Sequence, residues 1–330
     1  MNIALSDLSR LPSPLERVDF NYLDESYELY VKRDDLIHFV VGGNKWRKLM
    51  GHEVFREVGK KYSIVSTGGN YSNLVFALSY ICYVYGYPLT ILSPETETET
   101  YMMKWCRKLG TVFVGVSRSK LRAIRNGDLS PLNLLEIDEN VVWIPEGGGG
   151  EWSDSGIKSI IDELGFQAPN KDLVLLTAAG TGVTAFQLAN FLPIQWDLVV
   201  FPAIKSPSFI EFMEKGLIHS DRKAGTSLLL TQHTDKGIGQ VHEDLVDFLL
   251  GFYNQNGILL DPFYNGKALY YTIKNEHFKK NDKSIVLIHS GGAQAWVGLG
   301  NRYPYDRRIR VLAEVFMKQF RNENELGFDQ

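Results

Sequence analysis

Cysteine is scarce in this chain: two of its 330 residues are cysteines, Cys82 and Cys106. Two cysteines are too few for a scaffold held together by disulfides, and their spacing is not that of a zinc site. The sequence therefore predicts no metal site. The scarcity of cysteine fits a protein of the reducing cytoplasm, which is where we expect this chain to work.

An excess of charge of one sign and long hydrophobic runs are also lacking. The formal net charge is −4, which gives no reason to expect a nucleic-acid partner. Basic and apolar residues alternate over residues 118–125, a pattern typical of an amphipathic surface helix. No run approaches 18 uninterrupted apolar residues, and the start of the chain lacks the apolar core of a signal peptide. We therefore expect no membrane span and no export.

The chain has 44% hydrophobic residues, and short β-like runs alternate with longer helical patterns. This alternation is typical of mostly parallel sheets flanked by helices. The predicted strands are residues 27–31, 63–66, 89–92, 111–116, 141–144, 173–177, 197–201, 227–230 and 285–289. The predicted helices are residues 45–59, 72–85, 98–109, 153–164 and 181–191.

A polar segment at residues 168–172 reads as a linker before a second set of strand and helix units. The sequence thus predicts an α/β protein with two doubly wound open-sheet domains. We expect residues 1–48 and 165–330 to form the larger domain, and residues 49–164 to form the smaller one.

A glycine turn delivers Lys45 to the start of a predicted helix, with Arg47 and Lys48 close behind it. The helix dipole and the neighbouring positive charges disfavour the ammonium form of Lys45, so its pKa should fall. A lysine biased toward the neutral amine can form a Schiff base. The alternative is that Lys45 is simply solvated on a basic first turn.

Two further glycine clusters follow predicted strands and open helices. In the first, Gly68 and Gly69 would let the backbone approach a ligand, with Ser72 and Asn73 at the helix start. Ordinary N-capping would explain Ser72 or Asn73 alone.

In the second glycine cluster, residues 178–184 form Ala-Ala-Gly-Thr-Gly-Val-Thr, which fits a single phosphate group better than a nucleotide. A tight strand-to-helix turn is the alternative.

The last glycine cluster is His289-Ser290-Gly291-Gly292, at the end of a strongly apolar strand. Ligands of open α/β sheets bind beyond the carboxyl ends of strands, so Ser290 should face the same crevice as the other clusters. We interpret His289 as a packed histidine rather than a catalytic base. Tyr264 could place its phenol in this crevice or could be a core aromatic.

Six motifs together carry a resemblance to a known family. In chain order they are Gly-Gly-Asn-Lys-Trp-Arg-Lys-Leu, Gly-Gly-x-x-Ser-Asn, Pro-Glu-Gly-Gly, Ala-Gly-Thr-Gly, Asp-Pro-x-Tyr-x-Gly-Lys and His-x-Gly-Gly. The sequence resembles the 1-aminocyclopropane-1-carboxylate deaminase and D-cysteine desulfhydrase family from residue 12 to residue 292. That family depends on pyridoxal phosphate and has the fold of the tryptophan synthase β subunit. The resemblance implies a homodimer and a small amino-acid substrate, with the larger domain holding the cofactor.

The resemblance also implies roles for individual residues. Lys45 would form the Schiff base and remove the substrate's Cα proton, Ser72 would meet the carboxylate or relay a proton, and Tyr264 would flank the ring. The cofactor would be held by Lys45, Asn73, Ala179, Gly180, Thr181, Gly182, Thr184 and Ser290, with Ser290 at the pyridine nitrogen. The substrate would meet Asn70, Tyr71, Ser72 and Asn265.

Departures from the family pattern bear on the substrate. The deaminases carry Glu where this chain has Asn265 and Leu where it has Ser290, whereas the desulfhydrases tend to carry Ser and Thr there. The polar uncharged residues of this chain are closer to the desulfhydrase pattern. A neutral hydroxyl at the pyridine nitrogen makes the cofactor a milder electron sink, which suits elimination. Leu74 stands where many relatives have a polar or histidine residue, and residues 236–239 lack the tyrosine that the family usually places near Ile238. We therefore expect elimination from D-cysteine or a related D-amino acid, with the cyclopropane deaminase reaction and cofactor storage without turnover as alternatives.

Overall fold

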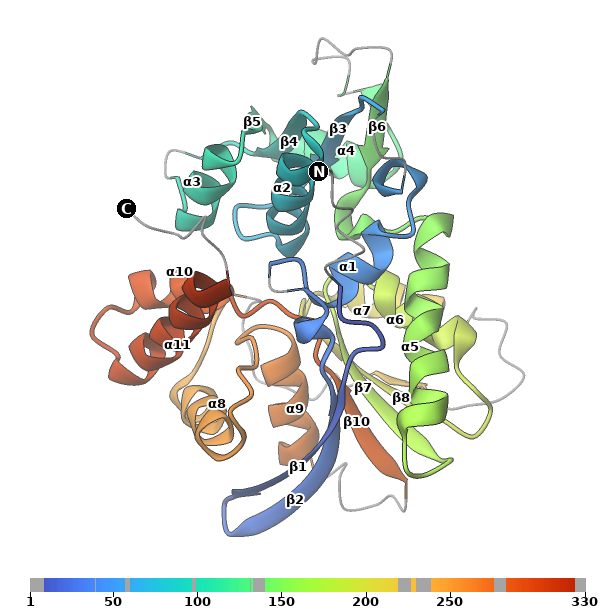
Figure 1. Cartoon of the computed structure of the whole chain (residues 1–330), viewed down its shortest axis with the longest axis vertical. Helices are drawn as coiled ribbons and strands as arrows, with labels where there is room; N and C mark the ends of the chain where they lie inside the picture. Colours follow the sequence, from blue (N-terminus) through green and yellow to red (C-terminus); the bar gives the residue numbers. More distant parts are fainter. Residues whose placement is uncertain are drawn as a thin grey trace. The chain divides into compact units, whose positions relative to one another are not determined.

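A computed structural model describes residues 9–38, 40–56, 60–96, 99–130, 132, 140–218, 227–229, 239–275 and 283–323 of the chain (Figure 1). The described residues divide into two compact units, each with its own sheet. Residues 10–44 and those from Ile157 onward form the larger unit, and residues 45–156 form the smaller one. The divisions expected from the sequence lay after residue 48 and at residue 165. The predicted α/β class with two largely parallel sheets is confirmed.

Within its described residues, the larger unit has a six-stranded sheet of order β1-β2-β10-β7-β8-β9, in which the β1–β2 pair is antiparallel and the other pairs are parallel. Its strands are β1 (Leu15–Tyr22), β2 (Glu25–Lys32), β7 (Leu173–Ala179), β8 (Asp197–Pro202), β9 (Ser227–Leu229) and β10 (Ser284–Ile288). Its helices are α5 (Asp154–Gln167), which begins in the smaller unit, α6 (Val183–Phe191), α7 (Pro207–Ile218), α8 (Glu243–Asn256), α9 (Asn265–Lys274), α10 (Ala295–Arg302) and α11 (Arg307–Glu323).

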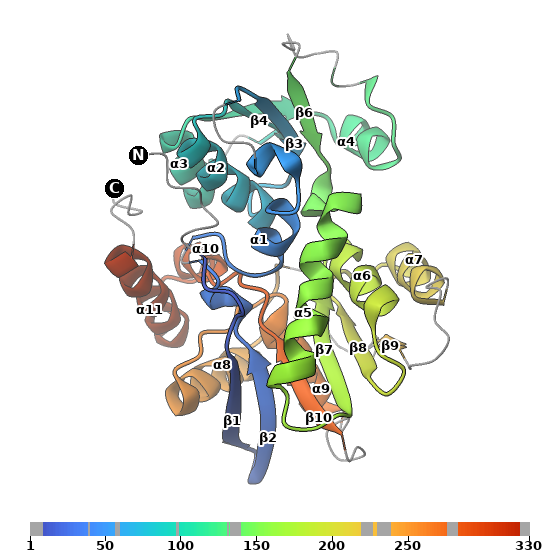
Figure 2. The same ribbon diagram turned by 45° about the vertical axis from the view of Figure 1, so that its right-hand side comes forward.

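Both faces of this sheet are covered, because successive residues of a strand point to opposite sides. Leu173 and Leu175 of β7 join a core with residues of α5 and α6, whereas Val174 and Leu176 join a second core with residues of α8 and α9. Figure 2 shows α5, α6 and α7 on one side of these strands. The inner strands are therefore apolar along their length, and polar groups gather beyond their ends.

The smaller unit has a parallel sheet of order β5-β4-β3-β6 in the part that the structure describes. Its strands are β3 (Ser63–Thr67), β4 (Leu89–Pro94), β5 (Thr111–Val116) and β6 (Val141–Ile144). Its helices are α2 (Asn73–Tyr85), α3 (Tyr101–Lys108) and α4 (Arg118–Arg125), together with all but the first two residues of α1 (Gly43–Leu49). No helix of the described residues is both long and apolar enough to span a bilayer.

The predicted helix over residues 45–59 is wrong in its extent. Helix α1 ends at Leu49, and a short 3-10 helix follows at Glu53–Phe55, where His52 accepts a hydrogen bond from the Val54 N–H. The chain turns at Gly51, where a Cβ would lie 1.9 Å from the Trp152 carbonyl oxygen, so only glycine fits. Residues 57–59 of that prediction lie outside the described residues, as does Leu230 of the predicted strand 227–230.

Strand β1 was not predicted, although it forms a hairpin with β2. Its exposed residues are the polar Arg17, Asp19 and Asn21, and its buried residues are Val18 and Phe20. The two turn residues, Leu23 and Asp24, have positive φ angles of 48° and 64°, a conformation that hairpins usually fill with asparagine or glycine. Without that turn signal the hairpin is hard to recognise from the sequence.

A buried ion pair ties β2 to α5 inside the larger unit. The Lys32 ammonium, which is fully buried, donates to Glu163 Oε2 at 2.5 Å, to the Ser13 carbonyl at 2.5 Å and to Gln167 Oε1 at 2.7 Å. The Ser13 N–H donates to the same Glu163 oxygen at 3.1 Å. Every hydrogen of the ammonium therefore has an acceptor, which is the condition for burying such a charge.

Removing one partner of this pair should be costly. We expect Glu163→Ala to lower the free energy of unfolding by about 3–5 kcal/mol, because it leaves the Lys32 charge buried without a carboxylate. The matched control is Asp162→Ala on the same helix, which breaks an exposed i,i+4 pair with Lys158 and should cost about 0.5 kcal/mol or less. Urea denaturation midpoints test both. Equal midpoints for the two variants would show that the buried pair does not stabilise the unit.

Candidate active site

The phosphate-binding loop predicted at residues 178–184 joins the end of β7 to the start of α6. Gly182 caps α6 in a left-handed conformation, with φ of 85°, and no side chain caps the helix. The first turn of a helix leaves N–H groups without intrahelical partners, so this end offers donors and a positive dipole to an anion. The Asn44 side-chain amide donates to Thr184 Oγ1 at 3.0 Å. The loop thus has the chemistry expected of a phosphate cradle.

Tyr264 lies beside this loop. A Cβ at Gly180 would come within 3.1 Å of the Tyr264 ring and 3.5 Å of its hydroxyl. The predicted loop glycine and the predicted ring-flanking tyrosine are therefore neighbours in the larger unit. A side chain at position 180 would require the Tyr264 ring to give way by a few tenths of an ångström.

The end of β10 is held against the start of α1. Gly43 has a φ of 70°, and a Cβ there would lie 1.9 Å from the Ser290 carbonyl oxygen. The Asp35 N–H also donates to the His289 carbonyl at 3.1 Å. The backbone of Ser290 is therefore fixed by close packing with the turn that precedes Lys45.

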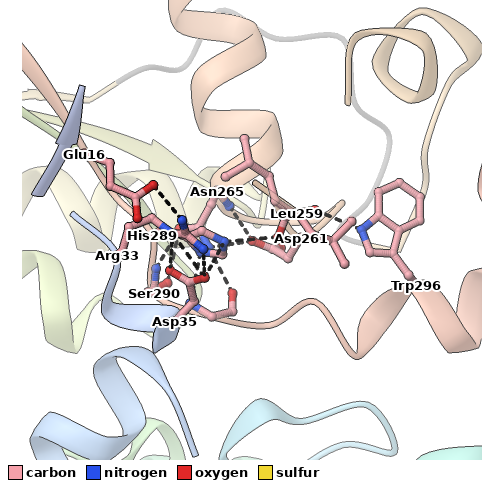
Figure 3. Close-up of polar contacts among 11 residues, drawn as sticks. Glu16, Arg33, Asp35, Leu259, Asp261, Asn265, His289, Ser290 and Trp296 are labelled. Atoms are coloured by element: carbon pink, nitrogen blue, oxygen red, sulfur yellow. Dashed lines mark hydrogen bonds and ion pairs between the residues drawn. The ribbon is translucent and has the colours of Figure 1, made fainter. Parts of the chain in front are cut away.

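Ser290 belongs to a polar network with Asn265 and Asp261, drawn in Figure 3. The Ser290 N–H and hydroxyl lie 3.4 Å and 3.2 Å from Asn265 Oδ1. The Asn265 Nδ2 group donates to Asp261 Oδ2 at 2.6 Å and to the Gly291 carbonyl at 3.0 Å. Asn265 and Asp261 are both fully buried. This network joins two predicted site residues, Ser290 and Asn265.

Asp261 was missed as a site residue by the sequence analysis. Its carboxylate accepts the backbone N–H groups of Phe263, Tyr264 and Asn265 as well as the Asn265 side chain. Burial raises the pKa of Asp261, and these hydrogen bonds and His289 oppose the rise. The Asp-Pro-x-Tyr spacing was the available signal, because an aspartate commonly accepts from N–H groups two and three residues later.

His289 has partners at both ring nitrogens. Its Nε2 lies 3.1 Å from the Leu259 carbonyl, and its Nδ1 accepts the Gly291 N–H at 3.3 Å. Asp35, which is paired with Arg33, lies 3.7 Å from Nε2. A fully buried imidazole that donates through Nε2 and accepts through Nδ1 has no lone pair left for a substrate, which favours the packed-histidine interpretation.

In the smaller unit, Lys45 and Lys48 share one acceptor. Both ammonium groups donate to the Gly147 carbonyl, Lys45 at 3.3 Å. Burial lowers the pKa of Lys45 to about 8, while the Lys48 side chain and Glu146 act to raise it. Burial and the proximity of Lys45 lower the pKa of Lys48 as well. The predicted fall in the pKa of Lys45 thus occurs, but burial is its leading cause and Lys48 acts in the opposite direction.

Lys48 was not predicted as a site residue. It is only 1% exposed, and it follows Lys45 by three residues, the spacing that places two side chains on the same face of a helix. That spacing was the signal in the sequence.

The loop after β3 holds the predicted substrate residues of the smaller unit. Ser72 caps α2 and accepts the Val75 N–H at 3.4 Å, so the capping interpretation holds for Ser72. Asn73 is the first residue of α2, and the Tyr71 side chain is exposed. Among the described residues no hydrogen-bond partner is found for three buried oxygens of this segment: Ser66 Oγ, Thr67 Oγ1 and Asn70 Oδ1.

Two positions that depart from the family pattern are Leu74 and Ile238, and the structure describes only the first of them. Leu74 is buried, and a Cβ at Gly148 would lie 3.0 Å from its Cδ1, so the leucine fills space against the Pro-Glu-Gly-Gly turn. Ile238 lies outside the described residues.

Among the described residues, no group of three acidic, histidine or cysteine side chains could hold a metal ion.

A protein that binds a phosphorylated aldehyde needs an amine that can be neutral and N–H donors for a phosphate. The smaller unit holds a lysine with a lowered pKa, and the larger unit holds a helix start with free N–H groups. The solved structure of an ACC deaminase homologue has the same fold, with a TM-score of 0.72 at 18% identity over 92% of this chain and 95% of that one. The sequence profile of pyridoxal-phosphate dependent enzymes matches residues 7–291. The chain belongs to that family and is a pyridoxal-phosphate dependent enzyme.

Curated relatives agree with the resemblance drawn from the motifs. A Thermotoga maritima protein, named provisionally as a 1-aminocyclopropane-1-carboxylate deaminase, is 28% identical over 87% of this chain and 95% of its own length. A D-cysteine desulfhydrase of Serratia proteamaculans is 26% identical over 88% of this chain and 94% of its own. The bifunctional D-cysteine desulfhydrase/1-aminocyclopropane-1-carboxylate deaminase of Arabidopsis thaliana is 23% identical over 86% and 77%. The predicted family resemblance is confirmed.

The lowered pKa of Lys45 predicts how the apoenzyme takes up its cofactor. Since only the neutral amine attacks an aldehyde, the rate of covalent attachment should fall about tenfold per pH unit below pH 8 and level off above it. Borohydride trapping of the adduct at a series of pH values measures this rate. Lys45→Ala should give no adduct, and Lys158→Ala, which removes an exposed lysine, should behave as wild type. A midpoint near the ordinary lysine value of 10.5 would contradict the assignment.

The packing at Gly180 predicts a loss of cofactor. Gly180→Val would press a branched side chain on the Tyr264 ring and distort the loop, so cofactor affinity should fall about tenfold or more, equivalent to about 1.4 kcal/mol. The control is Gly165→Val on α5, where a Cβ meets nothing within 4 Å. Equilibrium dialysis against pyridoxal phosphate measures the affinity. Unchanged affinity in Gly180→Val would remove this loop from the cofactor site.

Proposed function

We propose that this enzyme catalyses α,β-elimination from D-cysteine or a related small D-amino acid. With D-cysteine, the elimination and the hydrolysis that follows would release sulfide, pyruvate and ammonia. The proposal is carried by one observation: Ser290 and Asn265, at the two positions that separate the reactions in this family, are uncharged and hydrogen-bonded to each other.

The residues present fit the cofactor. The start of α6 offers N–H groups to a phosphate, Lys45 offers an amine with a lowered pKa, and Ser290 offers a hydroxyl beyond β10. Ala179, Gly180, Thr181, Gly182 and Thr184 would hold the phosphate, and Asn73 would meet the ring oxygen. Bound pyridoxal phosphate supplies an electron sink for the negative charge that develops at the substrate's Cα.

The other residues would bind the substrate and move its protons. Lys45 Nζ would remove the Cα proton, because an amine with a pKa of about 8 is partly neutral near pH 7 and is basic enough to accept one. Asn70, Tyr71 and Ser72 would receive the substrate carboxylate, a role that the N–H groups at the start of α2 support. Tyr264 would flank the ring and lies beside Gly180 of the phosphate loop.

Ring opening of the cyclopropane substrate has less support. The deaminases of the family have a glutamate where this chain has Asn265. The nearby carboxylate, Asp261, already accepts four N–H donors and is fully buried, so it is not free to act on a substrate. Elimination needs a leaving group on Cβ and no further carboxylate.

A comparison of substrates tests the proposal. The holoenzyme should release sulfide from D-cysteine faster than it forms 2-oxobutanoate from 1-aminocyclopropane-1-carboxylate. Asn265→Glu combined with Ser290→Leu should depress sulfide release about tenfold or more, because it adds a second buried carboxylate beside Asp261 and removes the hydroxyl. Preference for the cyclopropane substrate would overturn the proposal. Bound cofactor with no turnover of any small amino acid would favour a storage protein.

A further inference from the structure

We propose that His38 is a positioning residue for the lysine that takes the cofactor. Its ring nitrogen Nδ1 holds the backbone turn that leads into Gly43 and Asn44, and so sets how the chain enters α1, where Lys45 follows. The inference rests on the assignment of Lys45 as the Schiff-base lysine under the proposed function. It does not depend on the choice of substrate.

A side chain closes the turn before α1. The N–H groups of Val40 and Val41 donate to His38 Nδ1 at 3.1 Å and 3.2 Å. The histidine and both valines are buried. Buried backbone N–H groups need an acceptor, and here the imidazole supplies it. His38 therefore acts on the two N–H groups that follow it as an asparagine does in an Asx turn.

The bond from these N–H groups requires a neutral imidazole. An imidazole accepts through Nδ1 only when its single ring hydrogen is on Nε2. Burial lowers the pKa of His38 to about 4, so the ring is neutral through the neutral pH range. Since two N–H groups occupy the lone pair of Nδ1, this nitrogen is not available to take a proton from a substrate. The role that fits is positioning.

The turn brings the chain back over the residues that precede it. The Asp35 N–H donates to the His289 carbonyl at 3.1 Å, and the Asp35 carboxylate is paired with Arg33 (Figure 3). After the turn, a Cβ at Gly42 would lie 2.7 Å from the Asp35 carbonyl oxygen. The two ends of the loop are thus packed backbone against backbone, and His38 closes the loop between them.

Two further contacts follow within the larger unit. A Cβ at Gly43 would lie 1.9 Å from the Ser290 carbonyl oxygen, and the Asn44 amide donates to Thr184 Oγ1 at 3.0 Å. Contacts this close allow little displacement of the chain, so a turn that opened would disturb both of them. Lys45 is the next residue. The direction in which it begins its helical turn is therefore set by the loop that His38 closes.

Three substitutions separate the acceptor from the bulk of the side chain. His38→Asn keeps an acceptor, because its Oδ1 is separated from Cα by the same number of bonds as Nδ1 of histidine. His38→Leu fills the space without an acceptor, and His38→Gln displaces the acceptor by a methylene group. Hydrogen exchange over residues 40–44 of the full-length apoenzyme measures the turn. Borohydride trapping of pyridoxal phosphate measures its covalent attachment.

His38→Leu and His38→Gln should each speed hydrogen exchange of the Val40 and Val41 N–H groups about tenfold and slow cofactor attachment about tenfold or more. His38→Asn leaves a cavity, so its urea midpoint should fall, yet its rate of attachment should stay within about twofold of wild type. A role in stability alone predicts the opposite, with attachment following the urea midpoint across the three variants.

His242→Leu is the matched control. His242 Nδ1 accepts the Leu245 N–H at 3.3 Å and caps α8, a helix of the same unit with no predicted site residue. This variant should change neither exchange over residues 40–44 nor the rate of attachment.

Attachment at the wild-type rate in His38→Leu would overturn the inference, as would a His38→Asn variant as slow as His38→Leu. If His38→Leu does not fold, His38→Asn and His38→Gln decide the question, and equal rates in these two would overturn it. An adduct that persists in Lys45→Ala would instead overturn the assignment of Lys45, and the inference with it, whatever the sulfide assay shows.

Discussion

The close approach of Gly43 to the Ser290 carbonyl is the constraint on which the rest of the site depends. It is possible only because residue 43 has no side chain and adopts a left-handed conformation. The contact sets where α1 begins relative to β10, and two residues later the chain reaches Lys45. Asn44, between them, donates to Thr184 at the phosphate loop. Within the larger unit, residues 43 and 44 thus contact both the end of β10 and the loop before α6.

The sequence predicted the parallel strands well because their cause is local. Strands such as β5 (Thr111–Val116) and β6 (Val141–Ile144) are short apolar runs between breakers, and their predicted bounds match. The hairpin strand β1 and helices α7 to α11 were not predicted. In β1 the exposed residues are polar and the turn uses Leu23 and Asp24 in an uncommon conformation, so the strand depends on pairing with β2.

At the site, the glycine clusters predicted the loops and the candidate residues. Glycines that let the backbone approach a ligand, and residues that begin a helix, can both be recognised in the sequence. The four N–H groups that Asp261 accepts are local, from residues 263–265, and there the signal was present in the sequence but missed. Other partners were not visible in the sequence. That Lys45 and Lys48 share the Gly147 carbonyl follows from packing between segments about 100 residues apart. The cause of the lowered pKa of Lys45 was misjudged for the same reason, since burial is a property of the fold rather than of the neighbouring residues.

The two cores on either face of β7 and β10 have a consequence for how such an enzyme can diversify. The side chains of the inner strands pack on both faces of the sheet, so a substitution there lowers the free energy of unfolding. Ser290 and Asn265, beyond the strand ends, are held by polar contacts rather than by these two apolar cores. Substrate preference can therefore change by one or two substitutions at the rim of the sheet, while the folded scaffold is inherited unchanged.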